Sequence, residues 1–395
     1  MVNSYNFTRR ATDVPVSLIA YMMRYASKYE DVLSLGQGTP IFPTPEFIFE
    51  HLIDRSKRDP SVGMYSGAKI ENELKDLILK EVERLYGFTP KLEDIYLTVG
   101  GIGALFSALM TFLQEGDEVI YFDPSYPLHL SQIHLTQAKP VFVSFIEENG
   151  WSIDLKKLKD SITPRTKAII LTNPNNPTGT VLSRKEVEAL SESIISNNLI
   201  LILDEAYDFL VYEGEIYSPM RIPELRERTV LCKSFSKEFA MTGWRIGYAL
   251  AHPEIIRKIN DVHTYFSISP STPSIVAGIS ALSDVRGKKA RESFIEEFRK
   301  SREAICQRLE KLPKLFSFQK PKGAYYAFPK FLGFDLSALE FAQLLVDEAR
   351  VVTIPGSSMG PSGEGHLRLS FAAPASYIHK AFDRIDDFAK NHSLT

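Results

Sequence analysis

From about residue 70 to residue 260, short apolar segments alternate with segments of helical periodicity, and this alternation constrains the fold most strongly. Such runs are typical of strands that are buried on both faces of a parallel sheet. The expected strands are 95–99, 118–122, 140–144, 166–171, 200–203, 230–233 and 244–249, and the expected helices are 71–85, 104–113, 154–161, 183–196 and 253–260. The pattern predicts an α/β fold with a mostly parallel sheet between two layers of helices.

The two ends of the chain predict a second, smaller α/β domain. After residue 281, a long charged helix is expected over 284–312. The other elements expected at the two ends are a helix at 15–30, a strand-rich segment at 323–328, a helix at 336–349, and strands at 351–354 and 366–370 before a final helix. We therefore predict a large domain over 46–283 and a small domain that combines 1–45 with 284–395.

Composition excludes several classes of function. The chain has 395 residues and a formal net charge of −3, so no basic surface indicates nucleic-acid binding. No apolar run approaches the ~20 residues that a membrane helix needs. Arg9 and Arg10 are not followed by the apolar segment of a signal peptide. Cys232 and Cys306 do not make a disulfide framework, so we expect a cytoplasmic protein in a reducing compartment.

Two distinctive turns follow expected strands, at the edge where ligands bind in open α/β sheets. The glycine-rich segment 100–103 follows one strand and opens a helix, whose free N–H groups suit a phosphate. A glycine turn for close packing is the equal alternative. The segment 173–179 reads Asn-Pro-Asn-Asn-Pro-Thr-Gly, a rigid turn whose three asparagines offer fixed donors to a ligand. A plain turn is the alternative here.

One lysine stands in the run Ser-Phe-Ser-Lys-Glu-Phe-Ala-Met-Thr-Gly-Trp-Arg-Ile-Gly, which covers residues 234–247. A nucleophilic lysine must be neutral part of the time, so it needs partial desolvation or a cationic neighbour. Ser234 precedes Lys237 by three residues and Arg245 follows it by eight. A hydroxyl and a guanidinium suit a phosphate. This run indicates a lysine that holds an aldehyde cofactor carrying its own phosphate.

Two charged residues in apolar strands also need partners. Asp204 and Tyr207 belong to the sequence Asp-Glu-Ala-Tyr at the end of the strand 200–203. A buried carboxylate there would pair with a protonated pyridine nitrogen, and a helix N-cap is the even alternative. Arg368 lies inside the strand 366–370, where a substrate carboxylate or a structural salt bridge would satisfy its guanidinium.

Taken in their order, these motifs resemble those of the class I and II aminotransferases, which are pyridoxal-phosphate enzymes of fold type I. The likeness extends from the segment Leu-Ser-Leu-Gly-Gln-Gly at 33–38 to Arg368. The lysine run matches the attachment-site pattern of that family closely. The resemblance implies transfer of an amino group from an L-amino acid to a 2-oxo acid, with 2-oxoglutarate as the expected acceptor. It also implies a homodimer with shared active sites and no metal.

The resemblance implies a role for each matching residue. Lys237 corresponds to the lysine that binds the cofactor, Asp204 to the partner of the ring nitrogen, and Tyr207 and Asn176 to the partners of the phenolic oxygen. Tyr126 corresponds to the aromatic residue that stacks on the ring. The phosphate is expected to contact Ser234, Arg245, the N–H groups near Gly101 and Ile102, and Tyr65 of the neighbouring subunit. Arg368 corresponds to the clamp for the substrate carboxylate, with Gly38 and Asn176 in the same pocket.

The resemblance leaves the amino donor open between aspartate and aromatic or other neutral amino acids. Ile102 stands where some relatives have a polar or cationic residue, which weakens the case for an acidic side-chain pocket. Two other readings compete with the aminotransferase. A carbon–sulfur lyase or a cyclopropane-forming synthase shares the lysine and the sheet. A non-catalytic ligand sensor would add a DNA-binding module, which 395 residues do not accommodate beside this fold.

Overall fold

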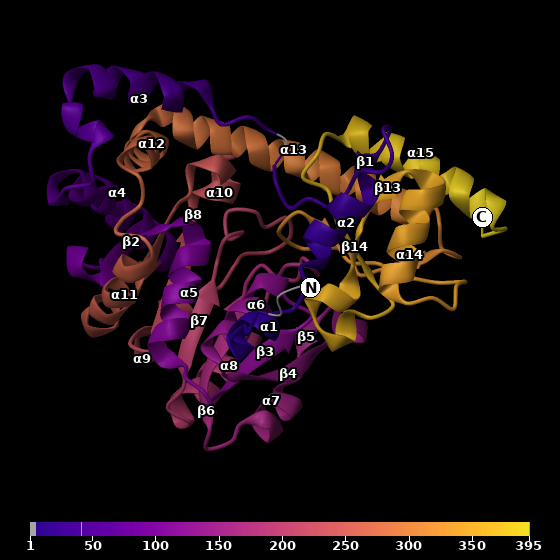
Figure 1. The fold of residues 1–395 in the computed structure, drawn as a ribbon, viewed down its shortest axis with the longest axis horizontal. Coiled ribbons are helices and arrows are strands. Elements are labelled where there is room, and N and C mark those ends of the chain that lie inside the picture. Colours follow the sequence, from indigo (N-terminus) through magenta and orange to yellow (C-terminus); the bar gives the residue numbers. More distant parts are fainter. Residues whose placement is uncertain (1–4, 41, 395) are drawn as a thin grey trace.

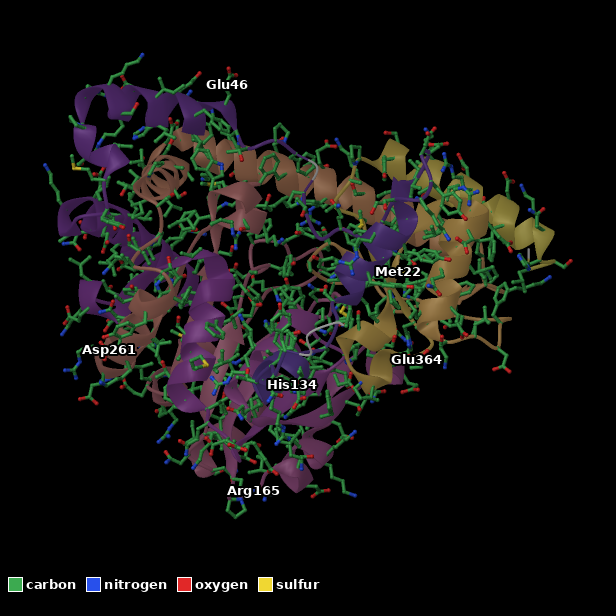
Figure 2. The ribbon with its side chains drawn as sticks, viewed as in Figure 1. Met22, Glu46, His134, Arg165, Asp261 and Glu364 are labelled. Carbon is green, nitrogen blue, oxygen red and sulfur yellow. The ribbon has the colours of Figure 1, made fainter. Side chains whose placement is uncertain are left out.

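The computed structural model describes residues 5–40 and 42–394. The predicted small-domain segment 1–45 therefore includes residues 1–4 and 41, which lie outside the described residues. Charged side chains such as Glu46, Arg165 and Asp261 lie at the periphery (Figure 2), whereas Met22 is buried. Within the described ranges, none of the helices combines the length and apolar character of a membrane span.

A mixed eight-stranded sheet forms the centre of the molecule, in the order β2-β9-β8-β7-β6-β3-β4-β5 (Figure 1). Its strands are β2 (Ile95–Val99), β3 (Glu118–Asp123), β4 (Lys139–Ile146), β5 (Ser152–Ile153), β6 (Thr166–Thr172), β7 (Ile200–Asp204), β8 (Thr229–Ser234) and β9 (Ile246–Leu250). The pairs from β8 through β4 are parallel. β9 is antiparallel to both of its neighbours, and β5 is antiparallel to β4. The predicted α/β fold with a largely parallel sheet is confirmed.

Helices surround this sheet and continue into the C-terminal part. Those up to residue 200 are α1 (Arg9–Thr12), α2 (Leu18–Ala26), α3 (Glu46–Arg58), α4 (Ala68–Tyr86), α5 (Gly100–Phe112), α6 (Pro127–Thr136), α7 (Leu155–Ser161) and α8 (Arg184–Ser196). The later ones are α9 (Pro223–Arg226), α10 (Phe235–Glu238), α11 (Pro253–Phe266), α12 (Thr272–Ser283), α13 (Val285–Glu310), α14 (Ala338–Leu344) and α15 (Ala375–Asn391). Helices α6 and α12 fall in segments for which the periodicity predicts no helix.

Alternate side chains of the central strands enter two apolar cores, as a sheet covered on both faces requires. In β6, Ala168 and Ile170 join one core, and Ile169 and Leu171 join the other. The first core is completed by side chains of α5, α6 and α11, and the second includes side chains of α4, α8 and α12. Burial on both faces explains why these strands are almost continuously apolar.

The segment from α2 to β1 joins the C-terminal elements, whereas α1 packs against α6 beside the central sheet (Figure 1). β1 (Leu33–Ser34) pairs in parallel with β13 (Val351–Val352). β11 (Tyr326–Ala327), β15 (Leu367–Ser370) and β14 (Ile354–Pro355) form a small antiparallel sheet, and β10 (Phe316–Ser317) pairs with β12 (Lys330–Phe331). The long helix α13 packs against both α12 and α15, so it connects the two regions (Figure 1).

Three predicted boundaries are wrong where the backbone leaves regular structure. The strand expected at 244–249 begins only at Ile246, because Arg245 has a φ of 53°, a left-handed conformation that a strand does not contain. The segment expected at 323–328 keeps only the two residues of β11, since Ala324 has a φ of 54°. The helix expected at 336–349 is regular only over α14 and ends in a wider π-type turn.

Candidate active site

A cavity of about 320 Å³ lies where the carboxyl ends of β6, β7 and β8 meet the first turn of α5. This is the edge at which ligands bind in α/β sheets, and the volume suits a small molecule. The predicted site residues that line it are Gly38, Gly101, Ile102, Tyr126, Asn176, Asp204, Tyr207, Ser234, Lys237, Arg245 and Arg368. Tyr65 is not among the lining residues, and it is 78% exposed.

Lys237 lies in α10, directly after β8, and its amine reaches the loop that follows β1. Its Nζ donates a hydrogen bond to the carbonyl oxygen of Gly38 at 2.7 Å. Burial, and after it the positive charges of Arg368 and Arg245, lower the pKa of Lys237 to about 8. All three causes penalise the ammonium form. A large fraction of Lys237 is therefore neutral near pH 8, and the neutral amine is the form that attacks a carbonyl carbon.

Asp204 ends β7, and both of its carboxylate oxygens are held by the protein. Oδ1 accepts a hydrogen bond from the backbone N–H of Ala206 at 3.1 Å, and Nε2 of the buried His129 donates to Oδ2 at 3.1 Å. Thr172 stands opposite Asp204 in the paired strand β6 and also lines the cavity. Its buried hydroxyl has no partner among the described residues, so it is available to a polar ligand.

Hydrogen-bond donors gather at the end of the cavity formed by α5. Gly100 begins this helix with a φ of +68°, and a Cβ there would lie 2.6 Å from Nη2 of Arg245. Nη1 of Arg245 donates to the carbonyl oxygen of Thr242 at 2.9 Å. A Cβ on Gly101 would lie 3.1 Å from that of Ser234, so this turn packs closely on the end of β8. Free N–H groups of a first helical turn beside a guanidinium and a hydroxyl suit a phosphate.

Arg368 lies in β15 and is 1% exposed. Its Nη2 donates to the carbonyl oxygen of Gly36 at 2.7 Å, and its Nη1 donates to Oδ1 of Asn176 at 3.3 Å. Nε has no partner among the described residues. Since these partners are a carbonyl and an amide, they do not neutralise the buried charge. A carboxylate that enters the cavity would do so.

Two hydroxyl-bearing rings, Tyr207 and Tyr326, form a pair on the cavity wall with 2.9 Å between their oxygens. Burial raises the pKa of Tyr207 well above its ordinary value, so its phenol stays protonated and can donate a hydrogen bond. A Cβ on Gly38 would lie 2.3 Å from the hydroxyl of Tyr326. Tyr325 also donates to the Gly38 carbonyl oxygen at 2.9 Å. Only glycine fits at position 38 without displacing this pair.

A second group of buried charged residues lies next to the cavity-lining residues in the sequence. Lys233 and Asp208 form a buried ion pair. Tyr86 donates a hydrogen bond to Oε2 of Glu205 at 2.7 Å. Burial, and then the nearby Asp208 carboxylate, raise the pKa of Glu205 to about 7. Burial therefore favours the protonated form of the Glu205 carboxyl in the folded protein.

Sequence reasoning assigned no role to three residues that the fold brings to the site: His129, Tyr326 and His263. His263 accepts the N–H of Val99 on Nε2 at 3.2 Å, and its Nδ1 lies 3.4 Å from the Tyr96 hydroxyl. Burial lowers the pKa of His263 to about 4, so Nε2 remains an acceptor at neutral pH. Each of the three acts on residues far away in sequence, and no local motif marks them.

Comparison with known proteins identifies the family of this chain. A family model described as aminotransferase class I and II matches residues 30–385. This chain belongs to the class I and II aminotransferases. The aminotransferase is 33% identical over 384 residues to aspartate aminotransferase of Pyrococcus horikoshii, with 97% of each chain covered. It is 34% identical over 383 residues to aromatic-amino-acid aminotransferase 2 of Thermococcus litoralis, with 96% and 97% covered.

Solved structures agree with the sequence relatives. The structure of Pyrococcus protein-A1 superposes with a TM-score of 0.93 at 32% identity and covers 98% of this aminotransferase and 99% of that chain. The predicted family and fold type are confirmed. Aminotransferases of this family depend on pyridoxal phosphate, and the cavity fits that group. It offers an amine with a pKa of about 8 for an aldehyde, donors for a phosphate, and the oriented carboxylate of Asp204 for a ring nitrogen.

Proposed function

We propose that this aminotransferase moves the amino group of an L-amino acid to 2-oxoglutarate in a ping-pong reaction. The donors that we propose are aspartate and aromatic or other neutral amino acids, because its relatives carry the names aspartate and aromatic-amino-acid aminotransferase. The observation that supports the proposal best is the single cavity that joins the Lys237 amine, the Asp204 carboxylate and the Arg368 guanidinium.

In this proposal, several side chains of the cavity each contact a different part of the cofactor. When bound, pyridoxal phosphate supplies an aldehyde carbon for the substrate amine and a ring that accepts electron density from a broken bond at Cα. Lys237 would bind it covalently, and the Asp204 carboxylate would accept a hydrogen bond from the protonated ring nitrogen. The remaining contacts are Tyr207 and Asn176 to the phenolic oxygen, Tyr126 to the ring face, and Ser234, Arg245, Gly101 and Ile102 to the phosphate.

Arg368 and Lys237 act on different parts of the substrate, the α-carboxylate and the Cα proton. Arg368 binds the α-carboxylate beside Asn176 and Gly38, which fixes the orientation of Cα relative to the base. Once the substrate amine has displaced it from the aldehyde carbon, the free Lys237 amine would remove the proton from Cα and, as a general acid, deliver it to that aldehyde carbon. Its pKa of about 8 suits both directions of transfer, since an effective catalytic pKa lies near the working pH. Holding the carboxylate in a buried guanidinium also favours loss of the proton over loss of CO₂.

We further propose a homodimer in which Tyr65 reaches the phosphate of the partner subunit. Large apolar side chains are exposed near Tyr65: Met64 is 66% exposed, Tyr265 93% and Ile268 58%. The Thr272 hydroxyl donates to the carbonyl oxygen of Met64 at 2.5 Å, which joins the two segments that carry them. A second copy would cover this surface. Sedimentation of a fully active monomer at assay dilution would contradict the proposal.

The location and domain division are also proposals. We propose a cytoplasmic enzyme of amino-acid biosynthesis, a location supported by two buried cysteines that form no disulfide. We propose a large domain over 46–283 and a small domain over 1–45 and 284–395, a division supported by the pairing of β1 with β13. Limited proteolysis that releases a stable fragment with other boundaries would contradict the division.

The experiment that tests the function measures oxo-acid formation from a panel of L-amino acids with 2-oxoglutarate and added cofactor. We expect glutamate to form in equal amount to the new oxo acid. Lys237→Ala should abolish turnover and the absorbance of the bound cofactor, whereas replacing the exposed Lys167 by alanine should not. Steady ammonia production from cysteine-type substrates when no oxo acid is added would instead identify a lyase. Near-normal activity of Lys237→Ala would refute the assignment of the catalytic lysine.

A further inference from the structure

We propose that Tyr326 is a positioning residue for the cofactor: its hydroxyl donates its proton to the Tyr207 oxygen, which leaves the Tyr207 proton for the phenolic oxygen of the cofactor. This role rests on the proposed function, because it takes Tyr207 as a partner of that oxygen. Tyr326 lies in β11 of the small antiparallel sheet, and its side chain lines the cavity at the edge of the central sheet.

The direction of this hydrogen bond follows from a count of protons. The two hydroxyl oxygens lie 2.9 Å apart, so one of the two phenols donates to the other. Burial raises the pKa of Tyr207 well above its ordinary value and also raises the pKa of Tyr326, so each phenol keeps its proton at neutral pH. A phenol has one proton to donate and can accept a hydrogen bond as well. When Tyr207 gives its proton to the cofactor, its bond to Tyr326 requires Tyr326 as the donor.

The neighbouring Tyr325 does not replace Tyr326 in this role. The Tyr325 hydroxyl donates its one proton to the Gly38 carbonyl oxygen at 2.9 Å. Its ring lies 5.2 Å from the Tyr207 ring at an interplanar angle of 87°, so it supports Tyr207 by edge-to-face packing. The Tyr326 ring packs on Tyr207 in a similar way, at 5.7 Å and 83°, and adds the contact between the hydroxyl oxygens.

A donor on Tyr207 strengthens the hydrogen bond that Tyr207 makes in turn. Hydrogen bonds in a chain polarise one another, and each is stronger where water is excluded. Packing holds the first member of this chain in place: Tyr326 is 1% exposed, and a Cβ on Gly38 would lie 2.3 Å from its hydroxyl oxygen. The Tyr326 oxygen therefore stays beside Tyr207, and Tyr207 becomes the stronger donor toward the cofactor.

Tyr326 also contacts the proposed carboxylate clamp, but through its ring. The Arg368 guanidinium lies over that ring, 4.7 Å from the centroid. Phenylalanine at position 326 keeps the ring and removes the oxygen alone. The charged groups that act on the Tyr326 hydroxyl, Arg368 and Asp204, are also unchanged in Tyr326→Phe. This variant therefore isolates the hydrogen bond to Tyr207 from the binding of the substrate carboxylate.

The test compares the wild-type holoenzyme with Tyr326→Phe, Tyr207→Phe and the double variant. The pH midpoint of the absorbance of the cofactor bound to Lys237 is recorded, and binding of the cofactor to the apoenzyme is titrated by fluorescence quenching. A hydrogen-bond donor stabilises the phenolic oxygen in its anionic form, so loss of the donor should raise the midpoint. We expect Tyr326→Phe to raise it by roughly 0.3–1 pH unit and to weaken cofactor binding by roughly 2- to 10-fold. The KM for the amino acid should stay within about twofold.

The double variant decides whether Tyr326 acts through Tyr207. In the Tyr207→Phe background, Tyr326→Phe should cause no further shift, because the chain is already broken at its second member. Tyr377→Phe is the matched control: its hydroxyl accepts the Ser34 N–H and does not line the cavity, so the midpoint should stay at the wild-type value.

Two results would overturn the role of Tyr326. One is a midpoint that Tyr326→Phe leaves unchanged, including the case in which only the KM rises, which would indicate direct contact with the substrate. The other is an equal shift from Tyr326→Phe in the wild-type and Tyr207→Phe backgrounds. A wild-type holoenzyme whose cofactor absorbance responds to no amino acid would refute the proposed function instead.

Discussion

Replacing Arg368 tests how the buried clamp works, and the structure sets the size of the effect. Its guanidinium is 1% exposed and already donates to Gly36 at 2.7 Å and to Asn176 at 3.3 Å. Arginine keeps a planar fork, so it can hold these partners and still present Nε to a substrate carboxylate. Lysine keeps the charge but concentrates its donors on one atom. The alanine and lysine variants therefore separate charge from geometry.

The expected losses follow from the cost of leaving a buried carboxylate without its partner. Truncating one partner of a buried charged pair costs about 2–5 kcal/mol, which corresponds to roughly 30- to 5,000-fold in kcat/KM for Arg368→Ala. Arg368→Lys loses about one charge-assisted hydrogen bond, or ~1.5–3 kcal/mol, which is roughly 10- to 150-fold. Arg368 is also the largest charge effect that lowers the pKa of Lys237, after burial. Removing it should raise that pKa above about 8.

The assay compares an amino-acid donor with the matching amine that lacks the α-carboxylate, in each variant and across pH. We expect the loss only with the amino acid, mainly as a raised KM, and an alkaline shift of the lysine titration in Arg368→Ala but not in Arg368→Lys. Thermal melting by circular dichroism serves as the folding control. An unchanged KM for the amino acid, or an equal loss with the amine, would refute the clamp.

Two further predictions concern residues beside the cavity. His263→Leu removes the acceptor for the Val99 N–H just before the first turn of α5, so the cofactor dissociation constant should rise about 10-fold. The kcat at saturating cofactor should stay within about twofold. A cofactor titration that does not change would contradict this prediction. The folded pKa of Glu205, about 7, lies above its ordinary 4.5, so its contribution to stability is full below pH 4.5 and is lost as pH rises through 7. Glu205→Gln should remove this loss, so the unfolding free energy of the variant minus that of the wild type should be higher at pH 8 than at pH 5 by up to about 3 kcal/mol. Urea denaturation at the two pH values measures this difference. The opposite pH trend would contradict the prediction.

The central sheet could be predicted because its strands are buried on both faces and carry a strong local signal. The expected strand 95–99 coincides with β2. The expected helix 284–312 contains α13, which begins one residue later and ends two residues earlier than expected. Segments without such a signal were missed. Helix α12 is apolar around most of its surface because it packs against α3, α4 and α13, so it shows little periodicity. The turn before β9 depends on a left-handed Arg245, which a local pattern does not reveal.

The residues of the cavity also divide into those that a local motif marks and those that it does not. Motifs at strand ends marked Asp204, Ser234 and Lys237, since polar residues at the end of an apolar strand stand out in any sequence. Other residues of the site have no such contrast. His129 is one of the two histidines of α6, and it matters because β7 brings Asp204 within 3.1 Å of its ring. Tyr65 keeps a proposed role that depends on a second copy of the chain.

By itself, the sequence determined which kinds of side chain the chain carries and, through its apolar segments, where most of the central strands lie along the chain. Only the tertiary structure decided which distant residues meet: the Lys237 amine and the Gly38 carbonyl are 199 residues apart, and the Arg368 guanidinium and the Gly36 carbonyl are 332 apart. It also decided the pKa of Lys237 and the set of side chains that lines the cavity. These properties depend on burial and on neighbouring charge, which arise from packing between elements and not from local sequence.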